Sequence, residues 1–242
     1  YIESVLDAAA AKGHRSGENP ARWKGHLDHL LPRPPKLTKG HHAAMPYAEI
    51  ASLLNELTTR SAVAARALEF LILTAARSGE VLGARWCEID LAGAVWTIPG
   101  SRMKGGREHR VPLSSRAVGL LQSLNSNRST SEYVFPGQRE GRPLSNMAFE
   151  MLLRRLDRGE WTTHGFRSSF RDWAGEATNY PRELAEAALA HVVGDETERA
   201  YRRGDALQRR RVMMDEWARF CSSGGSTHFG DGASAEAQSG IE

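Results

Sequence analysis

The chain has few of the residues from which disulfide frameworks, metal sites and membrane spans are built. Only 2 of its 242 residues are cysteine, Cys87 and Cys221, and they lie far apart in the sequence. No Cys or His spacing typical of a metal site is present, and a chain of this size needs no disulfide framework, so a reducing cytosol is the expected compartment. No apolar run approaches the ~20 residues that cross a membrane. We therefore expect neither a bound metal nor a membrane partner.

Two further absences concern the start of the chain and nucleotide-binding motifs. Residues 1–6 contain neither an initiator methionine nor a signal-peptide pattern. We therefore expect a fragment of a longer protein, beginning inside an earlier domain. The sequence also contains no P-loop, and it gives no reason to expect ATP or any other cofactor.

No charge of one sign is in large excess. The chain has 32 Lys plus Arg against 29 Asp plus Glu, a formal net charge of +3 and a pI near 9.0. A weak basic excess is usually a solvated surface, but arginine is much commoner than lysine, which favours an anionic partner. Hydrophobic residues make up 40% of the chain, enough for the core of one large domain or one domain plus part of another.

Residues 1–31 predict two helices, which are too few to bury a core alone. Apolar residues recur at helical spacing in the first helix, which we expect to end at Gly13. Asn19 and Pro20 are typical of an N-cap followed by the first position of a second helix. The Pro-rich stretch that follows, residues 32–44, predicts an extended linker.

The remainder predicts a mainly α fold with a small antiparallel β-sheet. Residues 61–73 are apolar nearly all round, which favours a central buried helix, with Ser61 as its candidate cap. Short strand-like segments interrupt the helices, with Ser101–Glu108 as a hairpin tip between the second and third strands. We expect strands at residues 86–91, 94–99 and 110–113, and helices at residues 46–57, 61–73, 117–124, 146–156, 164–176, 182–190 and 207–220.

The final helix, residues 207–220, carries an apolar stripe that has two interpretations. The stripe either packs on the domain's own core or docks on a neighbouring subunit, and we favour the first. It consists of Leu207, Met214, Trp217 and Cys221. Residues 222–242 are rich in Ser, Gly and Ala without an apolar period and are expected to be disordered.

Thr163–Arg167 is the stretch that most suggests chemistry. His164 and Arg167 are three residues apart and share one face of a helix. A solvated surface pair is the simplest interpretation of such a motif. Beside a phosphate, however, the imidazole can carry a proton next to a guanidinium that stays positively charged.

Arg77 follows the predicted buried helix, where an unpaired charge is costly. It must therefore meet an acid or line a site, and Glu80, one turn on, is the candidate partner. Arg85 lies beside a predicted strand, and we interpret it as structural. Lys104 lies on the hairpin tip, where it is either an ordinary exposed lysine or a proton donor that reaches a leaving group.

His191 and Tyr201 lie downstream, ten residues apart. Tyr201 is either a half-buried aromatic flanked by surface arginines or a nucleophile. A phenol is a weak nucleophile at neutral pH, and nearby cations would lower its pKa and also hold an anionic substrate.

The residues together match a family. The set Ala-Arg77-Ser-Gly-Glu80, Lys104 in a β-hairpin, His164-Gly-Phe-Arg167, Leu-Ala-His191 and Tyr201 resembles the tyrosine recombinases, and more closely the phage and genomic-island integrases. Five motifs occur in the family order, each in the secondary structure it needs. The resemblance covers roughly residues 40–221.

The resemblance implies a covalent mechanism. Tyr201 attacks the scissile phosphate, forms a 3′-phosphotyrosyl link and releases a 5′-hydroxyl. Lys104 protonates the leaving oxygen, and His164 assists proton transfer at Tyr201. Because the covalent link conserves the bond energy, religation needs no ATP, and the reaction is expected to need no metal.

The resemblance also implies how the phosphate is held. Arg77 and Arg167 clamp its non-bridging oxygens, His191 hydrogen-bonds it, and Glu80 orients the site. Physical chemistry agrees, because preorganised cations stabilise the charge that spreads over the oxygens in the transition state. One departure is Ala190, where many relatives have Gly before the histidine. Alanine is small, and we expect little effect.

By the same resemblance the chain divides into four parts. Residues 1–31 are the C-terminal helices of a truncated core-binding domain, residues 32–44 a linker, residues 45–221 the catalytic domain and residues 222–242 a disordered tail. The expected function is site-specific recombination that integrates or excises a prophage or genomic island. The alternative is a decayed integrase remnant that binds DNA without strand exchange.

The expected partner is double-stranded DNA carrying attachment sites, on which the protein would assemble as a tetramer. A host DNA-bending protein and an excisionase are further candidate partners. The expected location is the bacterial cytoplasm, in association with the nucleoid.

Overall fold

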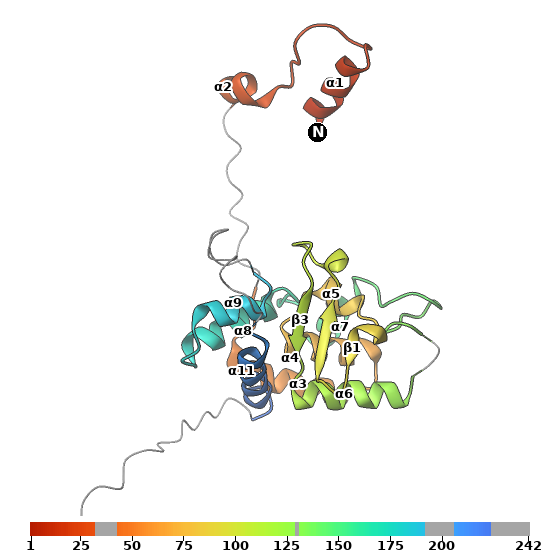
Figure 1. Cartoon of the computed structure of the whole chain (residues 1–242), viewed down its shortest axis with the longest axis vertical. Helices are drawn as coiled ribbons and strands as arrows, with labels where there is room; N and C mark the ends of the chain where they lie inside the picture. Colours follow the sequence, from red (N-terminus) through yellow and green to blue (C-terminus); the bar gives the residue numbers. More distant parts are fainter. Residues whose placement is uncertain (32–42, 129–130, 192–205, 224–242) are drawn as a thin grey trace, which may run out of the picture. The chain divides into compact units, whose positions relative to one another are not determined.

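The computed structural model describes residues 1–31, 43–128, 131–191 and 206–223. The chain separates into two compact units, Tyr1–Gly40 and His41–Glu242 (Figure 1). The division falls inside the predicted linker. The first unit therefore covers the residues of the two predicted N-terminal helices, and the second covers those of the predicted catalytic domain.

The N-terminal unit consists of α1 (Ile2–Ala11), the π-helical turn η1 (Trp23–Leu27) and the short α2 (Asp28–Leu30). The first predicted helix is confirmed, but a continuous second helix is wrong. Lys24 is extended (ψ 122°) and Gly25 has φ 78°, so the chain kinks where the helix was expected. None of the helical residues of this unit is buried, so the described residues form no apolar core here.

Asn19 does not cap that second helix. Its side-chain amide instead donates to the carbonyl of Glu3 (2.9 Å) and to Asp7 Oδ1 (2.7 Å). The side-chain oxygen accepts from the backbone N–H of Ala21, which closes a local turn. Asn19 thus ties the loop back onto α1, which explains why the expected cap is absent.

The C-terminal unit is mainly helical with one three-stranded antiparallel sheet of order β1-β2-β3, as the sequence predicts (Figure 1). Its register pairs Trp96 with Val111 and Ile98 with His109. The elements are η2 (Tyr47–Glu49), α3 (Ile50–Thr58), α4 (Val63–Thr74), α5 (Ser78–Leu82), η3 (Trp86–Glu88), β1 (Ile89–Asp90), β2 (Val95–Ile98), η4 (Gly100–Arg102), β3 (His109–Pro112), α6 (Ser115–Ser126), α7 (Ala148–Arg155), α8 (Gly165–Glu176), α9 (Arg182–Ala188) and α11 (Leu207–Phe220).

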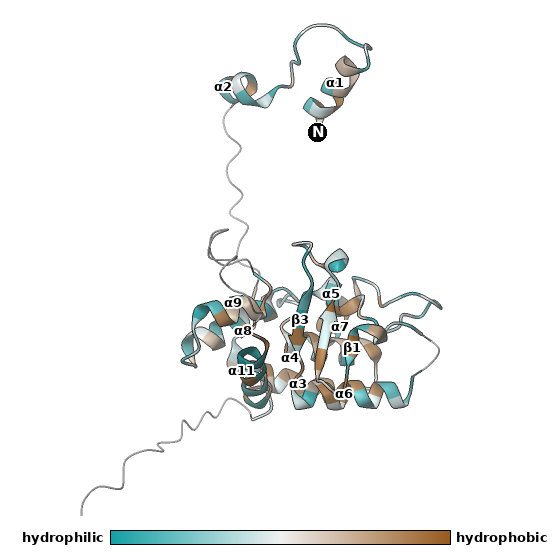
Figure 2. Ribbon diagram, viewed as in Figure 1, coloured by the Kyte–Doolittle hydropathy of each residue, from teal (hydrophilic) through white to brown (hydrophobic). Residues whose placement is uncertain are grey.

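α4 is the central helix, as predicted. Nine of its twelve residues are buried, and it packs against α3, α5, α6, α7 and α11. Figure 2 shows the apolar colours gathered on α3, α4 and the strands. Its start differs from the prediction, because Ala62 rather than Ser61 holds the N-cap position and no side chain caps the helix. The buried Glu69 is neutralised by Arg66 (2.9 Å) and Arg116 (2.8 Å).

The first strand is shorter than expected. Trp86–Glu88 forms a 3₁₀ turn because the Glu88 carboxylate accepts from the backbone N–H of Arg85 (3.3 Å). The Arg85 side chain forms an ion pair with Glu132 (2.9 Å) and its guanidinium lies over the Tyr133 ring. Arg85 is therefore structural, as the sequence indicated.

α11 packs on the core of its own domain, and the intramolecular interpretation of its stripe is confirmed. Trp217 is fully buried, contacts the rings of Phe170 and Trp173, and donates its indole N–H to the carbonyl of Ile72 (2.8 Å). The outer face of α11 is hydrophilic in Figure 2. The predicted tail and linker fall largely outside the described residues, in residues 224–242 and 32–42. No helix in the described ranges is both long and apolar enough to cross a membrane.

Trp217→Ala is expected to lower the free energy of unfolding by about 3–5 kcal/mol, because it leaves a large cavity between α11 and α8. The matched control is Val212→Ala on the exposed side of the same helix, which should change it by less than about 0.5 kcal/mol. Urea unfolding of both variants measures the difference. A cost below about 1 kcal/mol for Trp217→Ala would contradict the packing of α11 on this core.

Candidate active site

A cavity of about 450 Å³ opens between α5, the β2–β3 hairpin and the start of α8. It brings together four of the sequence-predicted basic side chains and Glu80. Its lining is Arg77, Ser78, Gly79, Glu80, Ser101, Arg102, Met103, Lys104, His164 and Arg167. These residues come from segments up to ninety positions apart, so only the fold assembles them.

Arg77 and Glu80 form the wall that α5 provides. Arg77 Nη1 donates to Glu80 Oε1 (2.8 Å), and the backbone N–H of Arg77 donates to Glu80 Oε2 (2.8 Å). The carboxylate thus caps α5 and also pairs with the guanidinium, while Glu80 itself is buried. Arg77 therefore forms the ion pair with Glu80 and also lines the cavity.

Arg167 lies in the first turn of α8 and is only 3% exposed. Nη1 donates to the carbonyl of Ala75 (2.5 Å) and Nη2 to that of Leu189 (2.7 Å). Its Nε is buried and has no hydrogen-bond partner among the described residues. Burial, and then the charge of Arg77, lower the pKa of Arg167 to about 10, so the guanidinium stays charged at neutral pH.

His164 is at the N-cap position of α8, and the approach of another segment shapes the backbone there. A Cβ on Gly165 would lie 2.2 Å from the carbonyl oxygen of Ala43, so only glycine fits. Thr162 Oγ1 accepts from the Gly165 N–H (3.0 Å), and the Thr162 N–H donates to the same Ala43 carbonyl (3.2 Å). Ala43, near the end of the predicted linker, is therefore bonded to the segment that leads into α8, which presents His164 and Arg167.

His191 contacts Arg167 but does not line the cavity directly. Its Nε2 lies 3.0 Å from Arg167 Nη2, and its Nδ1 lies 2.6 Å from Glu186 Oε2. Because a guanidinium only donates, Nε2 of the neutral ring accepts and Nδ1 carries the proton. The preceding Ala190 has φ 50°, a left-handed conformation that glycine adopts without strain.

Glu186 is a site residue that the sequence reasoning missed. It lies on the buried face of α9, and its other oxygen accepts from Arg171 Nε (2.7 Å). Burial raises the pKa of this carboxyl, but the hydrogen bond from His191 and the charge of Arg171 outweigh burial, so its pKa lies below the ordinary value. A sequence signal for Glu186 did exist: it is an acid on the apolar face of a predicted helix that ends just before His191, a candidate site residue.

Lys104 lies on an exposed turn of the hairpin. The Gly106 N–H donates to the carbonyl of Met103 (3.0 Å), and Gly106 takes a left-handed conformation (φ 66°). The buried Met103 anchors the turn below Lys104. Tyr201, the candidate nucleophile, lies outside the described residues.

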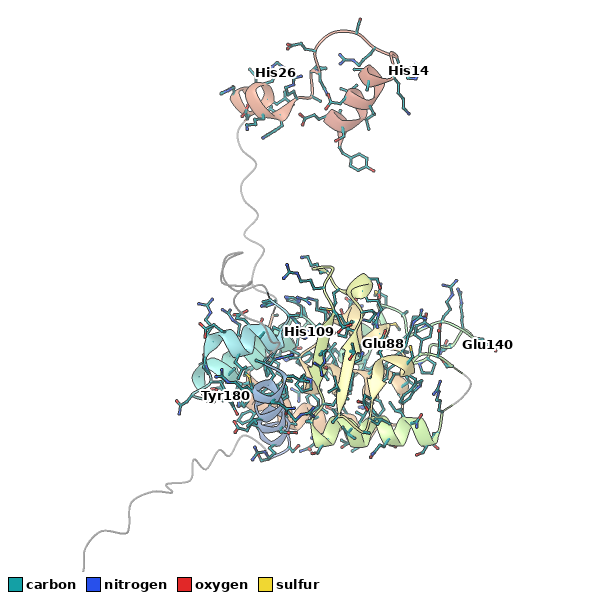
Figure 3. All side chains as sticks on the ribbon, viewed as in Figure 1. His14, His26, Glu88, His109, Glu140 and Tyr180 are labelled. Atoms are coloured by element: carbon teal, nitrogen blue, oxygen red, sulfur yellow. The ribbon has the colours of Figure 1, made fainter. Side chains whose placement is uncertain are left out.

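His109 on β3 is a second residue that the sequence reasoning missed (Figure 3). Burial, and then the charge of Arg210, lower its pKa to about 4, with smaller effects from Glu80 and Arg77. The imidazole is therefore neutral at neutral pH. No group of three or more His, Cys, Asp or Glu within the described ranges could hold a metal ion.

Comparison with known proteins gives one family match. Residues 44–207 match the model described as "Phage integrase family". The chain is 36% identical over 181 residues to prophage integrase IntZ of Escherichia coli (strain K12), covering 74% of this chain and 45% of that protein. It is 38% identical over 149 residues to prophage integrase IntA of the same strain, covering 61% and 36%. The chain thus spans less than half the length of these relatives.

Solved structures show the same fold at low identity. A lambda integrase tetramer bound to a Holliday junction matches with a TM-score of 0.56 at 16% identity, over 82% of this chain and 56% of that one. The integrase from mycobacterium phage Brujita matches with a TM-score of 0.55 at 19% identity, over 95% and 72%. These similarities show the tyrosine recombinase fold.

The stability of the protein is expected to fall with acid through His109. Its folded pKa of about 4 is below the unfolded value of about 6.5, so between these pH values the unfolded chain binds more protons. The contribution of neutral His109 to the free energy of unfolding is complete above pH 6.5. It is lost as the pH falls, and the loss is at most about 3 kcal/mol. His109→Gln should flatten this part of the profile.

Urea unfolding between pH 7 and pH 4 measures the effect. The control is His26→Gln, which replaces an exposed histidine of the N-terminal unit and should leave the profile unchanged. Equal slopes for the wild type and His109→Gln would show that His109 does not remain neutral on folding.

Proposed function

Because this chain belongs to the phage integrase family of tyrosine recombinases, we propose that it is the catalytic part of a site-specific DNA recombinase. It would cut and rejoin DNA through a 3′-phosphotyrosine intermediate, and so integrate or excise a prophage or genomic island. The observation that supports this most is the cavity in which Arg77, Lys104 and Arg167 converge. Three cations around one cavity suit a phosphodiester, whose charge spreads over its oxygens at the transition state.

The arginines would bind the non-bridging oxygens. Arg77 is held by Glu80 through Nη1 and by the carbonyl of Leu189 through Nη2 (3.5 Å), and the buried Nε of Arg167 lacks an acceptor among the described residues. An unpaired buried donor costs about 1–3 kcal/mol, and a phosphate oxygen is the acceptor that we propose for it. His191 would contribute a further contact to the phosphate by carrying a proton on Nε2 in the complex, in place of the bond that Nε2 now accepts from Arg167, while Nδ1 stays bonded to Glu186. Glu80, through its bonds to Arg77, would orient the site.

The covalent step would begin at Tyr201. Its phenol oxygen attacks phosphorus, the bond to the 5′ oxygen breaks, and the electron pair goes to that oxygen, which takes a proton from the Lys104 ammonium. The phenol proton leaves to a base, a role we propose for His164. Religation reverses these steps, so neither ATP nor a metal would be needed. The phosphotyrosine retains the energy of the broken bond.

The partners proposed for this chain follow the same family. The substrate would be double-stranded DNA carrying attachment sites, and the active assembly a tetramer, as the lambda integrase solved on a Holliday junction is a tetramer. A host DNA-bending protein and an excisionase are further proposed partners. The proposed location is the bacterial cytoplasm at the nucleoid.

A nicked duplex that traps the covalent intermediate tests the proposal. Its sequence would be selected by the protein from a randomised duplex library. The wild type is expected to form a protein–DNA adduct that survives denaturing electrophoresis and forms equally well in EDTA. Tyr201→Phe should form none, because it lacks the attacking oxygen. If neither protein forms an adduct although both bind the duplex, the chain is a DNA-binding remnant instead.

Arg77→Ala and Arg167→Ala separate catalysis from anchoring. Each is expected to slow adduct formation more than about 100-fold, because each removes a preorganised donor at the developing charge. DNA affinity should fall far less, since many other contacts hold the backbone. Arg154→Ala, which removes an exposed arginine paired with Glu150 on α7, is the control and should change neither quantity. Equal losses of rate and affinity would make the two site arginines phosphate anchors only.

A further inference from the structure

The hairpin turn that carries Lys104 gives its side chain no support of its own. Lys104 is exposed, and within the described ranges it makes no hydrogen bond or ion pair. Yet a proton donor must reach the leaving oxygen within about 3 Å. The position of its ammonium group therefore depends on what fixes the backbone on either side of the turn.

Arg102, two residues before Lys104, is the residue that fixes this backbone. Its Nη1 donates to the Glu88 carboxylate (2.5 Å to Oε1), and its Nη2 donates to the carbonyl oxygen of Glu80. The Arg102 side chain is 21% exposed and that of Glu88 only 6%. An ion pair this well buried is held far more firmly than a surface pair.

Glu88 is itself a fixed acceptor. It accepts from the indole Nε1 of Trp96 on β2 (3.0 Å) and from the backbone N–H of Arg85 (3.3 Å). Trp96 is fully buried in the core, so the carboxylate cannot move without disturbing the sheet. Figure 3 shows Glu88 beside the strands of the sheet. The base of the hairpin is therefore tied to the domain core through Arg102 and Glu88.

The second bond of Arg102 ties the hairpin to α5. This short helix has Arg77 at its N-cap and ends at Gly83. A Cβ on Gly83 would lie 3.0 Å from Arg102 Nη2, so the glycine leaves room for the guanidinium at the helix end. A cation bonded to a carbonyl in the last helical turn is also favoured by the helix dipole. Arg102 and Arg77 are thus attached to opposite ends of one five-residue helix.

We propose that Arg102 is a positioning residue for Lys104, fixing the base of the hairpin relative to the helix that carries Arg77. The assignment rests on the proposed function, in which Lys104 protonates the leaving 5′ oxygen. Arg102 also lines the cavity, but both of its terminal nitrogens are bonded to protein acceptors. Its role is therefore to place the neighbouring cation rather than to bind the phosphate.

A substrate with sulfur in place of the 5′-bridging oxygen tests this assignment. A thiolate is a far better leaving group than an alkoxide and departs without a proton, so the loss of a general acid should be rescued by the sulfur. Lys104→Met is expected to slow adduct formation on the oxygen substrate by about 100-fold or more, and to recover on the sulfur substrate. Arg102→Met should behave in the same way, with a loss of about 10- to 100-fold on oxygen and near-normal rates on sulfur.

Two further variants sharpen the test. Glu88→Gln keeps an acceptor for Arg102 but loses the charge, and should show a smaller loss that the sulfur also rescues. Arg107→Met removes an exposed arginine of the same hairpin that has no bond to either Glu80 or Glu88. Any effect of this control should be equal on the two substrates, because it would act through DNA binding. Thermal unfolding of each variant checks that it is folded.

The outcomes separate the two claims. If the wild type forms no adduct with either substrate, the proposed function fails and the assignment fails with it. If the wild type reacts but Arg102→Met and Glu88→Gln lose equal rate on oxygen and sulfur, only the assignment fails, because Arg102 then supports the whole site. Unchanged rates for both variants would also overturn it.

Discussion

One buried guanidinium connects the elements of the candidate active site. Arg167 extends from α8 to the carbonyl of Ala75, at the end of the central helix α4, and to that of Leu189, just after α9. Burying a cation without a carboxylate is costly, and ordered carbonyl dipoles offset that cost only where their geometry is fixed. The ends of three helices must therefore meet at one point for the charge to be tolerated.

The backbone turns that supply these carbonyls carry their own strain. Ala75 and Ala190 both have φ 50°, the left-handed region that costs an alanine roughly 1 kcal/mol. The helical segment ends at each of these turns. A carbonyl there accepts from Arg167 instead of continuing the helical hydrogen-bond pattern. The bonds to the charged guanidinium offset this strain. A helix end that would otherwise be a simple C-cap thus becomes part of the site.

Acids around the cavity orient its cations without neutralising all of them. Glu80 holds Arg77 and itself lines the cavity, and Glu186 holds His191. Lys104 and Arg167 have no carboxylate within ion-pair distance in the described ranges. A positive excess therefore remains for an anion, and Arg167, held by two backbone carbonyls, need not reorganise when the anion binds.

The sequence by itself determined the fold class, the central helix and the bounds of α11, because these depend on the local periodicity of apolar residues. It also singled out Arg77, Lys104, His164 and Arg167, which line one cavity in the structure, since their motifs are short and ordered along the chain. It did not predict the break at Gly25, where a left-handed glycine overrides the helical pattern. Only the tertiary structure revealed Glu186, His109 and the Arg102–Glu88 tie, because their roles arise from contacts between segments far apart in sequence, which no local pattern encodes.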